Sequence, residues 1–490
     1  MFHVSDEVRR LAERIQHTAL SRVNADPAEV AKHNAEHHTP DSSDKDIEER
    51  HASMTMADFY SMMPEHHYDT SLEYFRFCHD CTVTPYDRAP FLARFANIIP
   101  LCHALYTSGN PALRRNIVVT SLPFLNLNGV CIRHDETTDV VFLNQGLLSV
   151  LPMIYRFLLP LCNPQLFGTG AENNNLNNIF NILTEACFFK DGYNALKNER
   201  DFEYPHADEK WHVMHRLQKQ LERGSQKPAN GHEATGIEHP STYPFTQKMA
   251  HFLACRGAFV YILGHEFSHA YCNHGQYAQA EGVSLRNVEI LEGLEKEFAA
   301  ELGQYPEFSA RNTHFCVHQP IEEEADAHGL LCVFKYCEDN GLDDQRTVCV
   351  LTGALAAFLV MEIHECFTTV HALGAGPAHE FLTLNPFVRN MLFREEHPVP
   401  ITRLSMALNH DTFKDSPGLE LLGQFNGELI QVWQALYQSI AANFTEMEKI
   451  VHSAEMLDVE MEALFAGHCL GANDLSQAYF SKLRSLFQAK

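Results

Sequence analysis

The stretch LGHEFSHAYCNHG, residues 263 to 275, holds two histidines four residues apart, with a glutamate directly after the first. Residues at this spacing lie on one face of a helix, so His265 and His269 can present two imidazole nitrogens to one metal ion. Glu266 then lies beside the ion without binding it, where it can accept a proton from water. The stretch predicts a buried metal-binding helix, although so short a motif also arises by chance in a chain with 30 histidines.

A hydrolytic zinc site needs a third protein ligand, and PIEEEADAHG, residues 320 to 329, offers one. Glu322 and Asp326 are four residues apart, so their carboxylates lie on one face of a predicted helix. We expect Glu322 to bind the ion and Asp326 to accept a hydrogen bond from the far nitrogen of a ligand histidine. The small Ala325 allows the two helices to approach closely. The alternative is an acidic run that merely opens a helix and complements its dipole.

These two motifs, in this order, resemble the gluzincin type of zinc metallopeptidase. In that group the third ligand is a glutamate from a second helix, and an aspartate one turn later supports a histidine. The form Glu-x-x-Ala-Asp is most like the peptidases that include the CAAX prenyl protease and the bacterial heat-shock membrane protease. The resemblance implies one Zn²⁺ per chain, held by His265, His269 and Glu322, with Glu266 as general base and Asp326 behind a ligand. The metzincin pattern is excluded, because Cys272 and Gly275 stand where it requires Gly and His.

A later basic element, HPVPITRL, extends the resemblance. The related peptidases often carry His-Pro, four residues and Arg near the active site, and His397 and Arg403 occupy these positions. The resemblance implies that they support the cleft or the oxyanion of the transition state. It covers about a third of the chain, from Phe245 to about Asn409. A weaker resemblance, limited to the zinc helix, is to the soluble phage-exclusion peptidases of the Lit type.

Charge and composition limit the partners and the compartment. A formal net charge of −26 over 490 residues argues against a nucleic-acid partner, because that binding rests on Lys and Arg. Fourteen irregularly spaced cysteines suit a reducing compartment. The first twenty residues lack the apolar segment of a secretory signal. The longest uncharged apolar stretch, Thr347 to Met361, is too short to cross a bilayer and predicts a buried helix. We therefore expect a cytoplasmic protein without a membrane span.

The pattern along the chain predicts a mainly helical α+β protein with a zincin-like catalytic core. Turn-bounded runs of β-branched residues predict strands at 116–121, 123–133 and 139–143. The helical periodicity predicts long helices at 245–274, 321–338 and 344–373. We divide the chain into a helical segment to about residue 30 with a polar linker from Ala31 (together 1–53), an N-terminal α+β region with the small sheet (54–199), a polar loop (200–244), the helical catalytic core (245–410) and a C-terminal helical region (411–490).

Three further patterns allow more than one interpretation. Cys78-His-Asp-Cys81 is a single CxxC, whereas a structural zinc site needs four ligands, so we expect cysteines on the solvent side. The alternation in HFCVH, residues 314 to 318, is typical of a strand or loop rather than a metal site. The strand from Asp139 to Leu143 either offers an edge to an extended substrate or is a buried central strand.

The expected function is that of a soluble zinc-dependent endopeptidase. It would hydrolyse a peptide bond in an intracellular protein or peptide through a zinc-activated water. One alternative is a protease toxin or defence effector that is held inactive until an activating partner arrives. Another is a catalytically silent interaction protein that keeps the zincin fold as a scaffold.

Overall fold

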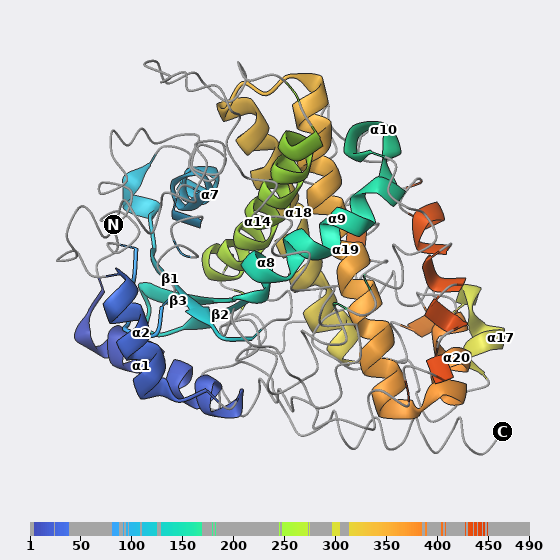
Figure 1. Cartoon of the computed structure of the whole chain (residues 1–490), viewed down its shortest axis with the longest axis horizontal. Coiled ribbons are helices and arrows are strands. Elements are labelled where there is room, and N and C mark those ends of the chain that lie inside the picture. Colours follow the sequence, from blue (N-terminus) through green and yellow to red (C-terminus); the bar gives the residue numbers. More distant parts are fainter. Residues whose placement is uncertain are drawn as a thin grey trace.

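The computed structural model shows a mainly helical α+β protein with a small sheet, as the sequence predicts (Figure 1). It describes residues 4–23, 25–38, 81–87, 98–107, 110–124, 129–168, 247–272, 296–303 and 313–384, and further single residues or short groups up to residue 448, among them 274 and 403. The polar loop 200–244, most of the linker up to residue 53, Cys78, His397 and residues 449–490 lie outside the described residues.

In the described part of the chain the sheet has three strands, β1 (Asn116–Leu122), β2 (Gly129–Arg133) and β3 (Thr138–Asn144), in the order β1-β3-β2. β1 runs parallel to β3, and β2 runs antiparallel to it. β3 is therefore the central strand, and every one of its residues is buried. Of the two interpretations of this strand, the buried central strand is confirmed and the substrate edge is wrong, because both sides of β3 are paired within the sheet. Among the described strands, β2 is an outer one.

Because side chains alternate between the two faces of the sheet, each face packs into a different hydrophobic core. Val118, Val140 and Phe142 pack with helix α1 (Asp6–Arg22), which covers one face of the sheet. Their neighbours at the odd-numbered positions pack on the opposite face, into a large core built mainly of helices. The result is a layered arrangement of α1, the sheet and the helical core (Figure 1). The large core includes residues from Cys81 to Phe444, so the sheet region and the predicted catalytic region share it.

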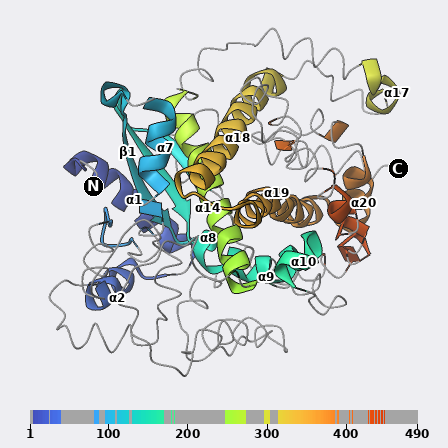
Figure 2. The same ribbon diagram turned by 90° about the horizontal axis from the view of Figure 1, so that it is seen from above.

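Three long helices form the centre of this core: α14 (Gln247–Tyr271), α18 (Thr313–Asp339) and α19 (Asp344–Leu373). They lie beside one another in both views (Figures 1 and 2). The bounds of α19 agree with the prediction, since Asp343 caps its first turn and Gly374, at φ 85°, ends it. The remaining helices with described bounds are α2 (Pro27–His38), α7 (Ile98–Thr107), η1 (Pro111–Leu113), α8 (Gly146–Ser149), α9 (Leu151–Cys162), α10 (Pro164–Phe167), α17 (Ala299–Leu302) and α20 (Ala375–Thr383).

The apolar helix α19 is a core helix in this structure. In the described part of the chain, its segment Asp344–Phe367 is long and apolar enough to cross a membrane by length and composition. Its most apolar window is nevertheless 78% buried inside the molecule. The length and composition of α19 are therefore accounted for by packing against its neighbours.

Glycines allow the central helices to approach very closely. A Cβ atom at Gly257 of α14 would collide with the backbone of Val350 in α19, and one at Gly353 would collide with Ala254. A Cβ at Gly264 would lie 2.8 Å from Cys332 Sγ of α18. Because Gly264 directly precedes the first histidine of the motif, this close approach brings α18 to the metal-binding segment of α14.

Three local predictions are wrong. Cys81 is buried rather than on the solvent side. α2 extends to His38. The polar pattern places the linker from Ala31 onward, but Ala31 to His38 are helical. α18 begins at Thr313, so HFCVH is helical rather than a strand or loop. In both segments a short polar or alternating pattern is outweighed by continuation of the neighbouring helix.

Candidate metal centre

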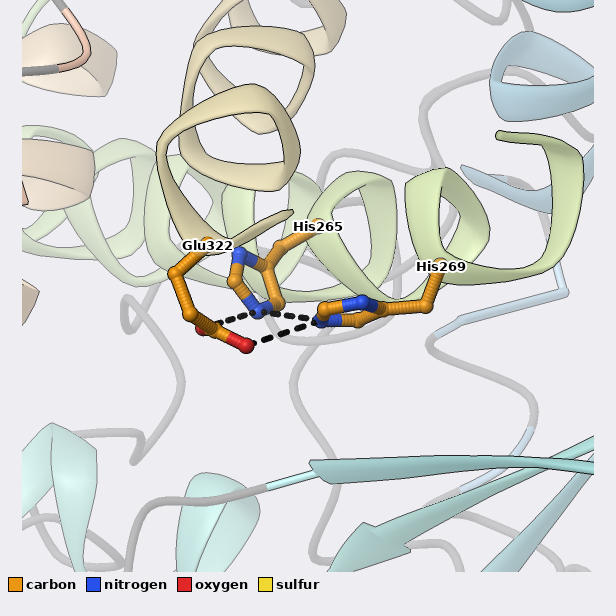
Figure 3. A group of neighbouring side chains, drawn as sticks. All are labelled: His265, His269 and Glu322. Carbon is orange, nitrogen blue, oxygen red and sulfur yellow. Dashed lines mark hydrogen bonds and ion pairs between the residues drawn. The ribbon is translucent and has the colours of Figure 1, made fainter. Parts of the chain in front are cut away.

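His265, His269 and Glu322 converge as the spacing predicts (Figure 3). α14 supplies both imidazoles, whose Nε2 atoms are 3.0 Å apart, and α18 supplies the carboxylate. Glu322 Oε2 lies 3.5 Å from His265 Nε2, and its Oε1 lies 3.6 Å from His269 Nε2. Ligands about 2.1 Å from a tetrahedral ion are about 3.4 Å from one another. The spacing of the three donors therefore fits a single metal ion, and the cluster can hold one.

Asp326 orients the first ligand from behind. Its Oδ1 lies 2.9 Å from His265 Nδ1, and the Tyr261 hydroxyl donates a hydrogen bond to the same oxygen at 2.5 Å. Arg403 donates two hydrogen bonds to this carboxylate, at 2.9 and 2.7 Å. Burial by itself raises the pKa of Asp326, but the charge of Arg403 and the hydrogen bonds from His265 and Arg403 lower it to about 2. A fixed anion thus keeps the Nδ1 side of His265 turned away from the cluster, with Nε2 facing it.

A relay of two polar side chains, His274 and Glu324, lies behind His269. His274 Nδ1 is 2.9 Å from His269 Nδ1, and His274 Nε2 is 2.9 Å from Glu324 Oε2. An ionised carboxylate only accepts, so His274 donates from Nε2 and a neutral ring then accepts at Nδ1. His269 must donate from its own Nδ1, which leaves its Nε2 lone pair directed at the cluster.

Sequence reasoning does not find this relay. By spacing, His274 is out of register as a ligand, and Glu324 is one member of an acidic run. The sequence does show that Glu324 lies one turn of helix before His328 and two residues after Glu322, which is a signal that it lies close to the predicted ligands. The partner of Glu324 cannot be found without the fold.

Glu266 lies against the sheet rather than in the three-donor cluster. It is only 4% exposed. A Cβ atom at Gly129, the first residue of β2, would lie 2.9 Å from Glu266 Oε1. A buried carboxylate that directly follows the first ligand in the chain, and is not one of the three donors, occupies the position that the motif gives to a general base.

Arg403 lies behind the ligands. Besides its bonds to Asp326, its Nη2 is 3.4 Å from Glu322 Oε2, and the whole side chain is buried. This geometry gives Arg403 a positioning role for both carboxylates. Its predicted support of an oxyanion stays a prediction, as does the role of His397, which lies outside the described residues.

Hydrogen bonds from two arginines, both ion-paired to β3, connect the sheet to the end of α14. Asp139 of β3 accepts from Arg115 at 2.6 Å and from Arg133 at 3.0 Å. Arg133 also donates to the carbonyl of Ala270 at 3.2 Å, and the backbone N–H of Arg115 donates to the Tyr271 hydroxyl at 3.3 Å. These contacts hold the helix that carries both histidines at a set position on the sheet.

The chain matches no protein-family model, no curated protein and no solved structure. The resemblance to gluzincin peptidases therefore rests on the motifs. The structure adds a metal-binding geometry that these motifs predict.

Proposed function

We propose that the chain is a zinc-dependent endopeptidase of the gluzincin type. The observation that carries the proposal is the convergence of His265, His269 and Glu322, with Glu266, the residue after the first ligand, buried but not among the donors. Three protein donors, among the residues that the structure describes, are typical of a catalytic zinc site, because such a site keeps a position for an exchangeable ligand. When bound, zinc supplies Lewis-acid chemistry, which lowers the pKa of water toward about 7 and polarises a carbonyl group.

The surrounding side chains have separate tasks in this proposal. Glu266 accepts a proton from the attacking water and returns it to the leaving amine. Asp326 and His274 hold the two imidazoles in the tautomer whose Nε2 faces the cluster. Arg403 offsets the charge of the two carboxylates that it touches.

The sheet suggests how a peptide would lie. An extended chain can add to an outer strand through backbone hydrogen bonds. β2 is an outer strand, and its first residue, Gly129, packs against Glu266. We infer that the substrate is an extended segment of a protein that lies along β2, with its scissile bond close to Glu266.

Metal analysis and one conservative substitution test the proposal. Zinc content should fall by one ion per chain in His265→Ala and in His269→Ala. Glu266→Gln should keep this zinc and abolish cleavage, whereas Glu338→Gln, at an exposed position of α18, should behave as wild type. The same two-His, one-carboxylate donor set also suits Fe²⁺, so iron in place of zinc would contradict the proposal.

A comparison of protein termini between two cell cultures would identify the substrate. New termini should appear in cells that express the wild type and be absent from cells that express Glu266→Gln. Turnover retained by Glu266→Gln would overturn its assignment as the base. Toxicity that disappears with this substitution would favour a toxin or defence effector, and zinc-loaded protein that cleaves nothing would favour an interaction protein.

A further inference from the structure

A second group of metal-ligating side chains lies next to the first. Cys272 follows the end of α14, and Glu324 and His328 are four residues apart on α18, so the latter two share one face of that helix. One donor atom from each of the three lies within 4.8 Å of the others. The group contains none of the three donors of the proposed catalytic site.

We propose that Cys272, Glu324 and His328 form a second cation site, which binds a divalent cation of the zinc class. A tetrahedral zinc ion about 2.3 Å from a sulfur and about 2.1 Å from a nitrogen places these atoms about 3.6 Å apart. The distance between Cys272 Sγ and His328 Nδ1 is 3.7 Å. Thiolate and imidazole donors select zinc, cobalt or copper, whereas calcium and magnesium require oxygen ligands.

The arrangement holds His328 ready to bind. Its Nδ1 is 3.1 Å from Ser268 Oγ, which is itself 3.6 Å from Cys272 Sγ. The ring of Tyr106 packs edge-on against the imidazole, with the ring centres 5.3 Å apart. These contacts direct Nδ1 toward the sulfur without a bound ion. Glu324 is 39% exposed, so a cation can reach the site from solvent.

The two sites are joined through one carboxylate. Glu324 accepts from His274, which in turn contacts His269 of the first cluster. Substitution of Glu324 would therefore disturb both sites at once. Cys272 and His328 are the better positions for a test, because they belong to the second group alone.

Cobalt substitution distinguishes the two sites, since a thiolate ligand gives Co²⁺ a sulfur-to-metal charge-transfer absorption that a His/His/Glu site lacks. Protein loaded with Co²⁺ should show this absorption. It should be lost in Cys272→Ser, together with one bound ion per chain, and it should persist in His265→Ala. The matched control, Cys162→Ser, should leave the absorption unchanged.

Unfolding curves of the metal-free variants separate loss of the site from loss of the fold. His328→Gln keeps the sulfur and should weaken Co²⁺ binding at this site at least tenfold, so it provides the test if Cys272→Ser does not fold. An absorption that survives Cys272→Ser, or its absence from wild type at saturating Co²⁺, would overturn the proposal. Neither result would affect the proposed catalytic site, whose metal and activity are measured through His265 and Glu266.

Discussion

Arg403 and Asp326 form a buried ion pair with two parallel hydrogen bonds. Arg403 Nε lies 2.9 Å from Asp326 Oδ2, and Nη2 lies 2.7 Å from Oδ1. Asp326 is completely buried, and Arg403 is 6% exposed. Because Oδ1 is also 2.9 Å from His265 Nδ1, this pair connects the stability of the core to the orientation of a metal ligand.

Replacing Arg403 with Gln should destabilise the protein and weaken metal binding together. Asp326 would be left as a buried carboxylate without its cation, which typically costs about 3 to 5 kcal/mol. Chemical denaturation of the metal-free protein measures the first effect, and competition with a chelator measures the second. Arg389→Gln is a matched control, because Arg389 is equally buried against Glu362 at 2.7 Å but touches no metal donor. The control should lose comparable stability and keep its metal affinity. Wild-type metal affinity in Arg403→Gln would refute the positioning role of Arg403.

Replacing His274 with Leu should reduce zinc affinity by roughly 10- to 100-fold, the usual effect of removing a partner that orients a metal ligand. The physical reason is that His269 would no longer be held with its proton on Nδ1. Zinc affinity measured by chelator competition provides the readout. His251→Gln, which alters a half-buried histidine bonded to the Phe167 carbonyl, should leave the affinity unchanged. Wild-type affinity in His274→Leu would show that the relay does not set the tautomer.

Features that depend on local spacing could be predicted from the sequence. The pairs His265 with His269 and Glu322 with Asp326 each follow from one turn of helix, and helix geometry fixes their common face. The predicted bounds of α19 are the observed ones, because a capping Asp343 and the terminal Gly374 mark its ends chemically. The existence of the three strands likewise follows from their β-branched runs, although the second begins at Gly129 rather than at the predicted Pro123.

Features that depend on contacts between distant segments could not be predicted. Gly129 lies against Glu266, although the two residues are 137 positions apart in the chain. No pattern of residue spacing in the sequence predicts this contact. β3 is central because it pairs with both β1 and β2, and the sequence of a single strand does not specify which strands it pairs with. His274 has a role only because α18 brings Glu324 beside it.

Replacing Gly129 with Ala should impair catalysis while leaving zinc content unchanged. The added Cβ would lie 2.9 Å from Glu266 Oε1 and 3.0 Å from its Cγ, so the buried carboxylate must shift. A displacement of this kind can lower kcat/KM by roughly 10- to 100-fold. Gly376→Ala is the control, because a Cβ there meets nothing within 4 Å. Full activity in Gly129→Ala would show that Glu266 tolerates the shift and is not held by the sheet.

Acid should destabilise the fold partly through His103, which is buried beside Phe267 and Tyr271 of α14. Burial, aided by the charge of Arg114, lowers the pKa of His103 to about 4. The unfolded chain takes up this proton near pH 6.5 and the folded protein only near pH 4, so stability is complete above the first value and is lost as the pH falls between them. The loss amounts to roughly 2 kcal/mol at pH 5.

His103→Phe removes this titration and keeps an aromatic ring in the core. Its free energy of unfolding, measured by urea denaturation of the metal-free protein at a series of pH values, should fall less steeply than that of wild type between pH 6.5 and 4. Above pH 7 the two curves should run parallel, because the histidine is then neutral in both states. Identical slopes below pH 6.5 would mean that His103 takes up its proton equally well in the folded protein, and that the packing against α14 does not exclude the charge.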